Sequence, residues 1–185
     1  MQLLQHVLLV VACLVYGGFT AGYLRFFRRP HGTPPEMKVV AVVSGAVTAL
    51  QIALIAGRPA TWPSFVLALA LYLAAAALYG WAIWTTRRRR PSVAFSADQP
   101  ELLFADGPYR LIRHPFYASY LLYWAAGVIA ARQPWLAVTV VLAGGSFLWA
   151  ALREERKFAA SPLATAYRSY QARTGMFVPK LFGRR

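Results

Sequence analysis

The sequence predicts an all-α integral membrane protein with five transmembrane helices. The first observation is that 58% of the 185 residues are hydrophobic, compared with about 45–50% in an average soluble domain. The second is that five stretches carry no Asp, Glu, Lys or Arg, and each is near the roughly 20 residues that a helix needs to cross a bilayer. These stretches are residues 1–24, 39–57, 59–86, 114–131 and 133–152.

The third observation is the uneven distribution of the basic residues. The net charge is +14, which in a soluble protein would suggest a nucleic-acid partner. Here the charges lie between apolar stretches, and we expect no nucleic acid. Of the 20 basic residues, eighteen fall in residues 25–38, 87–113 and 153–185, and the other two are Arg58 and Arg132. Because basic loops stay in the cytoplasm, the N-terminus is expected outside and the C-terminus inside.

We expect a single membrane domain over residues 1–185, with a three-helix scaffold over 1–86 and a second part over 87–185. Residues 1–24 lack a basic start, and their apolar stretch exceeds the ~7–15 residues of a signal peptide, so this helix is expected to be retained. Small size and the absence of a long polar N-terminal extension favour a bacterial inner membrane, and we expect a monomer. Arginines 87–90 are expected to lie against anionic lipid headgroups.

The last two apolar stretches are joined by residues 132–134, which predicts an antiparallel hairpin. Pro115 limits the fourth helix to about 16 residues, or roughly 24 Å, less than the ~30 Å hydrocarbon core. Proline suits the first turn of a helix, so unpaired N–H groups are expected at residues 113–115. The last helix is expected to continue through residues 153–158 and stop near Pro162, before a short helix around residues 167–170.

An acidic pair, Glu154 and Glu155, follows the last apolar stretch. The helix dipole disfavours carboxylates there by roughly 0.3–1 kcal/mol each, so the pair needs a cation. Either the neighbouring residues Arg153, Arg156 and Lys157 neutralise it, or it binds a ligand.

Across the hairpin, Arg113 and His114 stand at a helix start that favours an anion. Tyr109, Phe116 and Tyr117 are expected between this helix start and the acidic pair, and their rings offer surfaces for stacking. A zwitterion with a planar ring and a positive centre, such as S-adenosylmethionine, would fit these three features. No G-x-G occurs, and His6, His31, His114 and Cys13 lack metal-ligand spacing, so we expect no metal.

The strings over residues 107–117 and 167–179, together with the acidic pair between them, resemble the isoprenylcysteine carboxyl methyltransferase family. Phospholipid N-methyltransferases share its core. The resemblance covers about residues 101–181 and implies S-adenosylmethionine in a cytoplasm-facing pocket that the C-terminal segment closes, with a lipophilic substrate reaching it from the membrane. The cofactor contacts implied are Glu101, Leu102, Leu103, Phe104, Tyr109, Arg113, His114, Pro115, Phe116, Tyr117 and Glu154.

The sequence departs from the family pattern in three places. Ser119 stands where glycine is usual, and Pro162 stands where a phenylalanine-glycine pair is typical, in a spacing about one residue longer. Ala150 replaces an arginine that holds the substrate carboxylate in the eukaryotic enzymes, and Arg153 is expected on another face of the helix. The acceptor is therefore open between O-, N- and S-methylation.

Three functions remain in view. The first is methyl transfer to a lipophilic acceptor; a carboxylate acceptor needs no base, whereas an amine or thiol could lose its proton to Glu154, Glu155 or His114, the candidate catalytic residues. The second is an NADPH-dependent reductase of the sterol type, with the basic loop holding phosphates. The third is a non-catalytic protein that binds lipids. The expected partners are a lipophilic substrate and membrane lipids.

Overall fold

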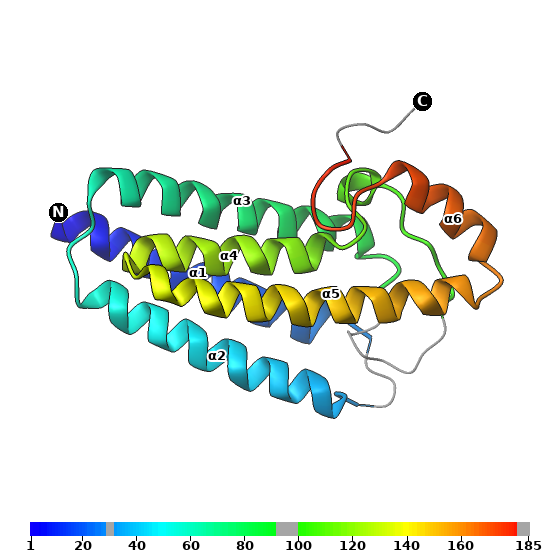
Figure 1. The fold of residues 1–185 in the computed structure, drawn as a ribbon, viewed down its shortest axis with the longest axis horizontal. Coiled ribbons are helices and arrows are strands. Elements are labelled where there is room, and N and C mark those ends of the chain that lie inside the picture. Colours follow the sequence, from blue (N-terminus) through cyan, green and yellow to red (C-terminus); the bar gives the residue numbers. More distant parts are fainter. Residues whose placement is uncertain (29–31, 92–99, 181–185) are drawn as a thin grey trace.

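A computed structural model describes residues 1–28, 32–91 and 100–180 of the chain, and within these residues the protein is helical throughout (Figure 1). The elements in order are α1 (Gln2–Phe26), α2 (Pro35–Ala56), α3 (Trp62–Thr86), η1 (Gly107–Arg110), α4 (Pro115–Ala131), η2 (Pro134–Leu136), α5 (Ala137–Ala159) and α6 (Ala164–Arg173). The described residues contain no strand, and an isolated parallel bridge joins Ile112 to Gly175.

The apolar helices lie where the charge-free stretches predict them. Four are long and apolar enough to cross a membrane: α1, α2, α3 and the 26-residue run Pro134–Ala159. The other, α4, is an apolar helix of 17 residues. The outer faces carry large exposed hydrophobic side chains such as Leu3, Val42 and Val141, a distribution typical of a surface that contacts lipid or protein.

Helix α4 lies at the centre of the bundle and packs against α1, α2, α3 and α5 (Figure 1). It buries 11 of its 17 residues, whereas α2 buries three of its 22. A helix surrounded by protein does not have to match the thickness of a bilayer as a lipid-facing helix does. Its short length is therefore compatible with a central position.

Local sequence accounts for where these helices begin and end. A capping box between Thr61 and Ser64 starts α3, and Pro115 occupies the first turn of α4. Arg132 ends α4 in the left-handed conformation, with φ of 54°, which turns the chain into the predicted hairpin. The predictions that the last helix continues past Leu152 and that a short helix follows are confirmed by α5 and α6.

The short helices η1 and α6 lie at one end of the helical bundle. Figure 1 shows η1, α6 and the C-terminal end of α5 gathered at one end, while the N-terminus lies at the opposite end. We call the first the polar end; it comprises residues 87–91, 100–114 and 153–177. The candidate cofactor contacts and candidate catalytic residues from the sequence analysis lie at this end or on the first turn of α4.

Close packing of α1 on α3 generates a first prediction. A Cβ atom at Gly22 would lie 2.6 Å from ring atom Cε1 of Tyr79, and the Tyr79 hydroxyl is held by a 3.0 Å hydrogen bond to the carbonyl of Phe19. Gly22→Ala should therefore destabilise the fold by about 1–3 kcal/mol through overpacking. Thermal unfolding in detergent measures this. Gly18→Ala, with nothing within 4 Å, is the matched control; equal midpoints would contradict the packing.

Candidate active site

A cavity of about 710 Å³ opens at the polar end and extends between α1, α2, α4 and α5. It reaches from Glu101 at the polar end to Trp124 in the middle of α4. Every residue implied as a cofactor contact lines it: Glu101, Leu102, Leu103, Phe104, Tyr109, Arg113, His114, Pro115, Phe116, Tyr117 and Glu154. Segments separated by about 40 residues in the sequence therefore share one cavity.

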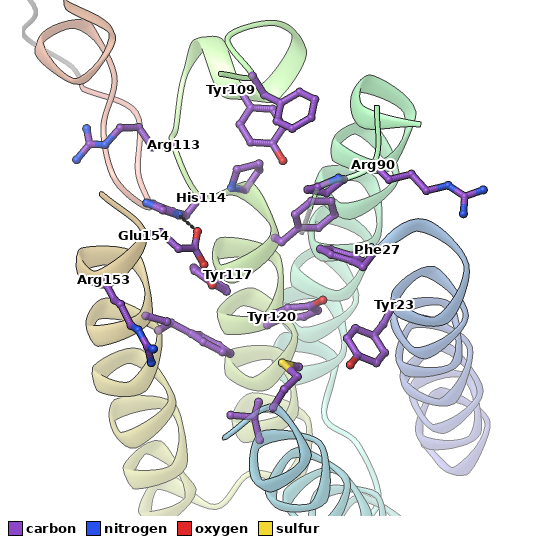
Figure 2. A pocket seen from close by; sticks show the side chains of 18 of the residues that line it. Tyr23, Phe27, Arg90, Tyr109, Arg113, His114, Tyr117, Tyr120, Arg153 and Glu154 are labelled. Atoms are coloured by element: carbon purple, nitrogen blue, oxygen red, sulfur yellow. Dashed lines mark hydrogen bonds and ion pairs between the residues drawn. The ribbon is translucent and has the colours of Figure 1, made fainter. Parts of the chain in front are cut away.

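The centre of the polar end is a contact between the first turn of α4 and α5. The Tyr117 hydroxyl donates a hydrogen bond to the Glu154 carboxylate, and Nδ1 of His114 lies 3.7 Å from Oε2 of the same carboxylate. The Tyr117 ring stacks on Phe147, with centroids 5.0 Å apart, and on His114, with centroids 5.5 Å apart. Figure 2 shows His114, Tyr117 and Glu154 close together. These contacts hold the Glu154 carboxylate at the cavity wall.

The second acid, Glu155, has a different environment. It does not appear among the described residues that line the cavity. Its Oε1 accepts hydrogen bonds from Nε of Arg113 at 2.8 Å and, for the tautomer that carries this proton, from Nε2 of His114 at 3.2 Å. Its Oε2 accepts from Nε2 of Gln171 at 2.8 Å. The side chains of Arg113, His114 and Glu155 are only 8–10% exposed, so this carboxylate joins α4, α5 and α6 inside the protein.

The segment after α6 pairs with the backbone that precedes α4. The N–H of Arg113 donates to the carbonyl of Gly175 at 2.8 Å, and the N–H of His114 donates to the carbonyl of Met176 at 3.1 Å. The expectation of unpaired N–H groups at residues 113–115 is therefore wrong: a backbone segment remote in the sequence satisfies two, and Pro115 has none. No side chain caps α4. The first N–H groups at the start of this helix are therefore those of Phe116 and Tyr117.

The G-P-Y string folds as the short helix η1 against the end of α3. Gly107 has φ of 56°, and a Cβ atom there would overlap Oγ1 of Thr85, so both conformation and space require glycine. The Tyr109 ring packs on Phe104, with centroids 5.7 Å apart, and its carbonyl accepts a 2.8 Å hydrogen bond from the Tyr170 hydroxyl. Burial raises the pKa of the Tyr109 hydroxyl well above its usual range, and burial raises the pKa of Tyr170 to about 12. Both phenols stay neutral at physiological pH.

Arg153 lines the same cavity as Ala150 and Glu154. The expectation that it lies on another face of the helix than Ala150 is therefore wrong, because residues three positions apart are neighbours on a helix surface. Nη1 of Arg153 lies 3.9 Å from Oε1 of Glu36 on α2, and both side chains are nearly half exposed.

The sequence analysis missed the contribution of the first two helices to this cavity. These residues are Tyr16, Phe19, Thr20 and Tyr23 of α1 and Met37, Val40, Ala41 and Ser44 of α2. Both sets repeat at intervals of three to four residues, so each forms one stripe of a helix. On α1, the stripe of rings and hydroxyls along an otherwise aliphatic helix was the available signal. Among the described residues, no group of three or more His, Cys, Asp or Glu is placed to hold a metal ion.

Part of the chain is similar in sequence to a known protein. Methanethiol S-methyltransferase 2 from Bradyrhizobium diazoefficiens is 32% identical over 78 residues, which are 42% of this chain and 29% of that protein. No family model matches the chain. The chain is thus similar, over less than half of its length, to a methyltransferase. This similarity supports methyl transfer in general.

The different environments of the two acids generate a second prediction. Glu155→Gln removes the carboxylate that faces the buried Arg113 guanidinium, and breaking a buried ion pair from one side costs about 3–5 kcal/mol. Glu154→Gln keeps an oxygen that can accept from Tyr117 at a side chain that is 37% exposed, so it should change stability by less than about 1 kcal/mol. Thermal unfolding of both variants in detergent compares them. A Glu155→Gln midpoint equal to that of Glu154→Gln would refute the joining role of Glu155.

Proposed function

We propose that this chain is an integral membrane methyltransferase of the isoprenylcysteine carboxyl methyltransferase type, which transfers a methyl group from S-adenosylmethionine to a lipophilic acceptor. In this proposal all five apolar helices are embedded in the membrane and the polar end faces the cytoplasm, as the positive-inside rule requires. The observation that carries the proposal is the convergence of the eleven implied cofactor contacts on one cavity. The similarity to a methyltransferase supports the reaction class.

The residues at the polar end fit the chemistry of S-adenosylmethionine. Phe104 and Tyr109 offer ring surfaces against which a purine can stack. The first turn of α4 lacks a side-chain cap, so its N–H groups and dipole favour a carboxylate. The Glu154 carboxylate and the Tyr117 ring at the cavity wall favour a sulfonium charge. When bound, this cofactor supplies an electrophilic methyl group.

The chain itself has to align the two reactants and exclude water, because methyl transfer is an in-line displacement. The rings of Tyr117 and Phe147 form one wall, and the segment after α6 pairs through its backbone with residues 113–114 at the polar end. Glu154 and His114 border the cavity and are the groups that could accept a proton from an amine or thiol. We assign Glu155, which joins α4, α5 and α6, a positioning role.

The deep part of the cavity supports a lipophilic acceptor. Between Tyr117 and Trp124, both in its lining, α4 rises about 10 Å. Tyr16, Phe19 and Phe147 complete this part of the wall. The relative is named for methanethiol, a very small thiol, and a thiol acceptor is compatible with this site. The apolar depth favours an acceptor with a larger hydrocarbon body.

The choice of cofactor can be tested by calorimetry on detergent-purified protein. S-adenosylmethionine should bind saturably, and Glu154→Gln and His114→Ala should each weaken binding by about tenfold or more, because each removes a charged or ring contact. NADPH is titrated separately. NADPH binding that His114→Ala abolishes would assign the protein to the reductases. Binding of neither cofactor would favour a non-catalytic role in lipid binding.

A second test separates the acceptor part of the cavity from the cofactor part. Ala150 is buried on α5 and lines the cavity, so Ala150→Phe should fill it and reduce methylation of lipophilic acceptors by about tenfold or more while S-adenosylmethionine binding persists. Transfer of a radiolabelled methyl group to an extract of membrane lipids, followed by organic extraction, measures this. Leu148→Phe, on an exposed part of the same helix, is the matched control. Label that stays in the aqueous phase for all three proteins would contradict a lipophilic acceptor.

A further inference from the structure

A second cavity lies beside the first, where the polar ends of α1 and α3 meet. The backbone N–H of Arg28 donates a 2.9 Å hydrogen bond to the carbonyl of Pro91, which brings Arg28 next to the arginines that follow α3. The cavity has a volume of about 500 Å³ and is lined by Arg28, Arg88, Arg89, Arg90, Glu101 and Leu102. We call it the arginine pocket.

The described residues that line the arginine pocket carry unbalanced charges. Four guanidinium groups face one carboxylate among the described residues that line it. Nη1 of Arg28 lies 3.3 Å from Oε2 of Glu101, and the two side chains are 49% and 71% exposed. An ion pair this exposed contributes little to stability. An anion with several oxygens can therefore replace Glu101 as the partner of Arg28 at small cost.

The four arginines after α3 are not equivalent. Arg87 donates a 2.6 Å hydrogen bond from Nη1 to the carbonyl of Trp84, and its guanidinium lies 3.5 Å from the centroid of the Trp84 ring. Arg87 does not appear among the lining residues, whereas Arg88, Arg89 and Arg90 do. Figure 2 shows Arg90 directed away from His114 and Glu154, beyond the end of α1. A general attraction of the basic run to a charged surface would not distinguish these positions, but a defined site would.

We propose that the arginine pocket is a binding site for a phosphate group. Guanidinium groups match phosphate oxygens with paired hydrogen bonds, and four of them around one cavity favour a ligand with more than one anionic oxygen. Arg28, Arg90, Glu101 and Leu102 also line the larger cavity. A phosphate bound here lies at the opening of the candidate active site. It comes either from the headgroup of an anionic phospholipid or from a soluble phosphate compound.

The experiment uses the full chain purified in detergent and does not depend on methyl transfer. Native mass spectrometry counts retained phosphatidylglycerol and phosphatidylcholine, and calorimetry follows inorganic pyrophosphate. We expect saturable binding of phosphatidylglycerol or pyrophosphate that Arg28→Gln and Arg90→Gln each weaken by about tenfold, as expected for a lost charged hydrogen bond. Arg87→Gln, which makes the same charge change beside the pocket, should leave binding unchanged. Unfolding midpoints equal to that of the unsubstituted chain verify that the variants are folded.

Each outcome decides the proposal or the source of the phosphate. Selective retention of phosphatidylglycerol over phosphatidylcholine assigns the site to a lipid headgroup, whereas pyrophosphate binding without lipid selectivity assigns it to a soluble phosphate. Equal loss in Arg87→Gln and Arg28→Gln would overturn the proposal in favour of general attraction by the basic run. The absence of binding of both anions would also overturn it.

Discussion

The buried carboxylate of Glu155 is the interaction on which the polar end depends. It accepts from Arg113 before α4 and from Gln171 on α6, and it lies within hydrogen-bonding distance of Nε2 of His114. Desolvating a carboxylate and a guanidinium is unfavourable, and the cost is offset only when the remaining hydrogen-bonding sites are occupied. Three partners from two other segments meet that condition. Without this carboxylate, the buried Arg113 guanidinium would lose its charged partner on α5, and His114 would lose its contact on the side of the ring opposite Glu154.

Much of the helical architecture could be predicted because the charge pattern is simple. Each apolar helix overlaps a stretch free of Asp, Glu, Lys and Arg, and Pro115 and Arg132 mark the two ends of α4. The cofactor contacts were implied by a resemblance, and they share one cavity because the hairpin places the start of α4 beside the end of α5. Their chemical roles remain proposals.

The parts that could not be predicted depend on contacts between remote segments. Basic neighbours on the same helix were one candidate partner for the acidic pair, yet Glu155 pairs with Arg113, 42 residues earlier. Likewise the N–H groups of residues 113 and 114 are satisfied by a segment about 60 residues later. No local pattern specifies such pairs. The hydrophobic periodicity of α1 and α2 specifies a stripe, but not whether that stripe faces another helix or a cavity.

The pairing of residues 111–114 with residues 175–176 has a consequence for biosynthesis. The helices α1 to α5 precede α6 in the chain, so they leave the ribosome first, and the backbone partners of Arg113 and His114 follow later. Until Gly175 and Met176 are made, those two N–H groups have no protein partner, and Arg113 lacks its contacts with Gln171 and Thr174. Because α6 also contributes Tyr167 and Tyr170 to its lining, the cavity can be completed only after the five apolar helices have been synthesised.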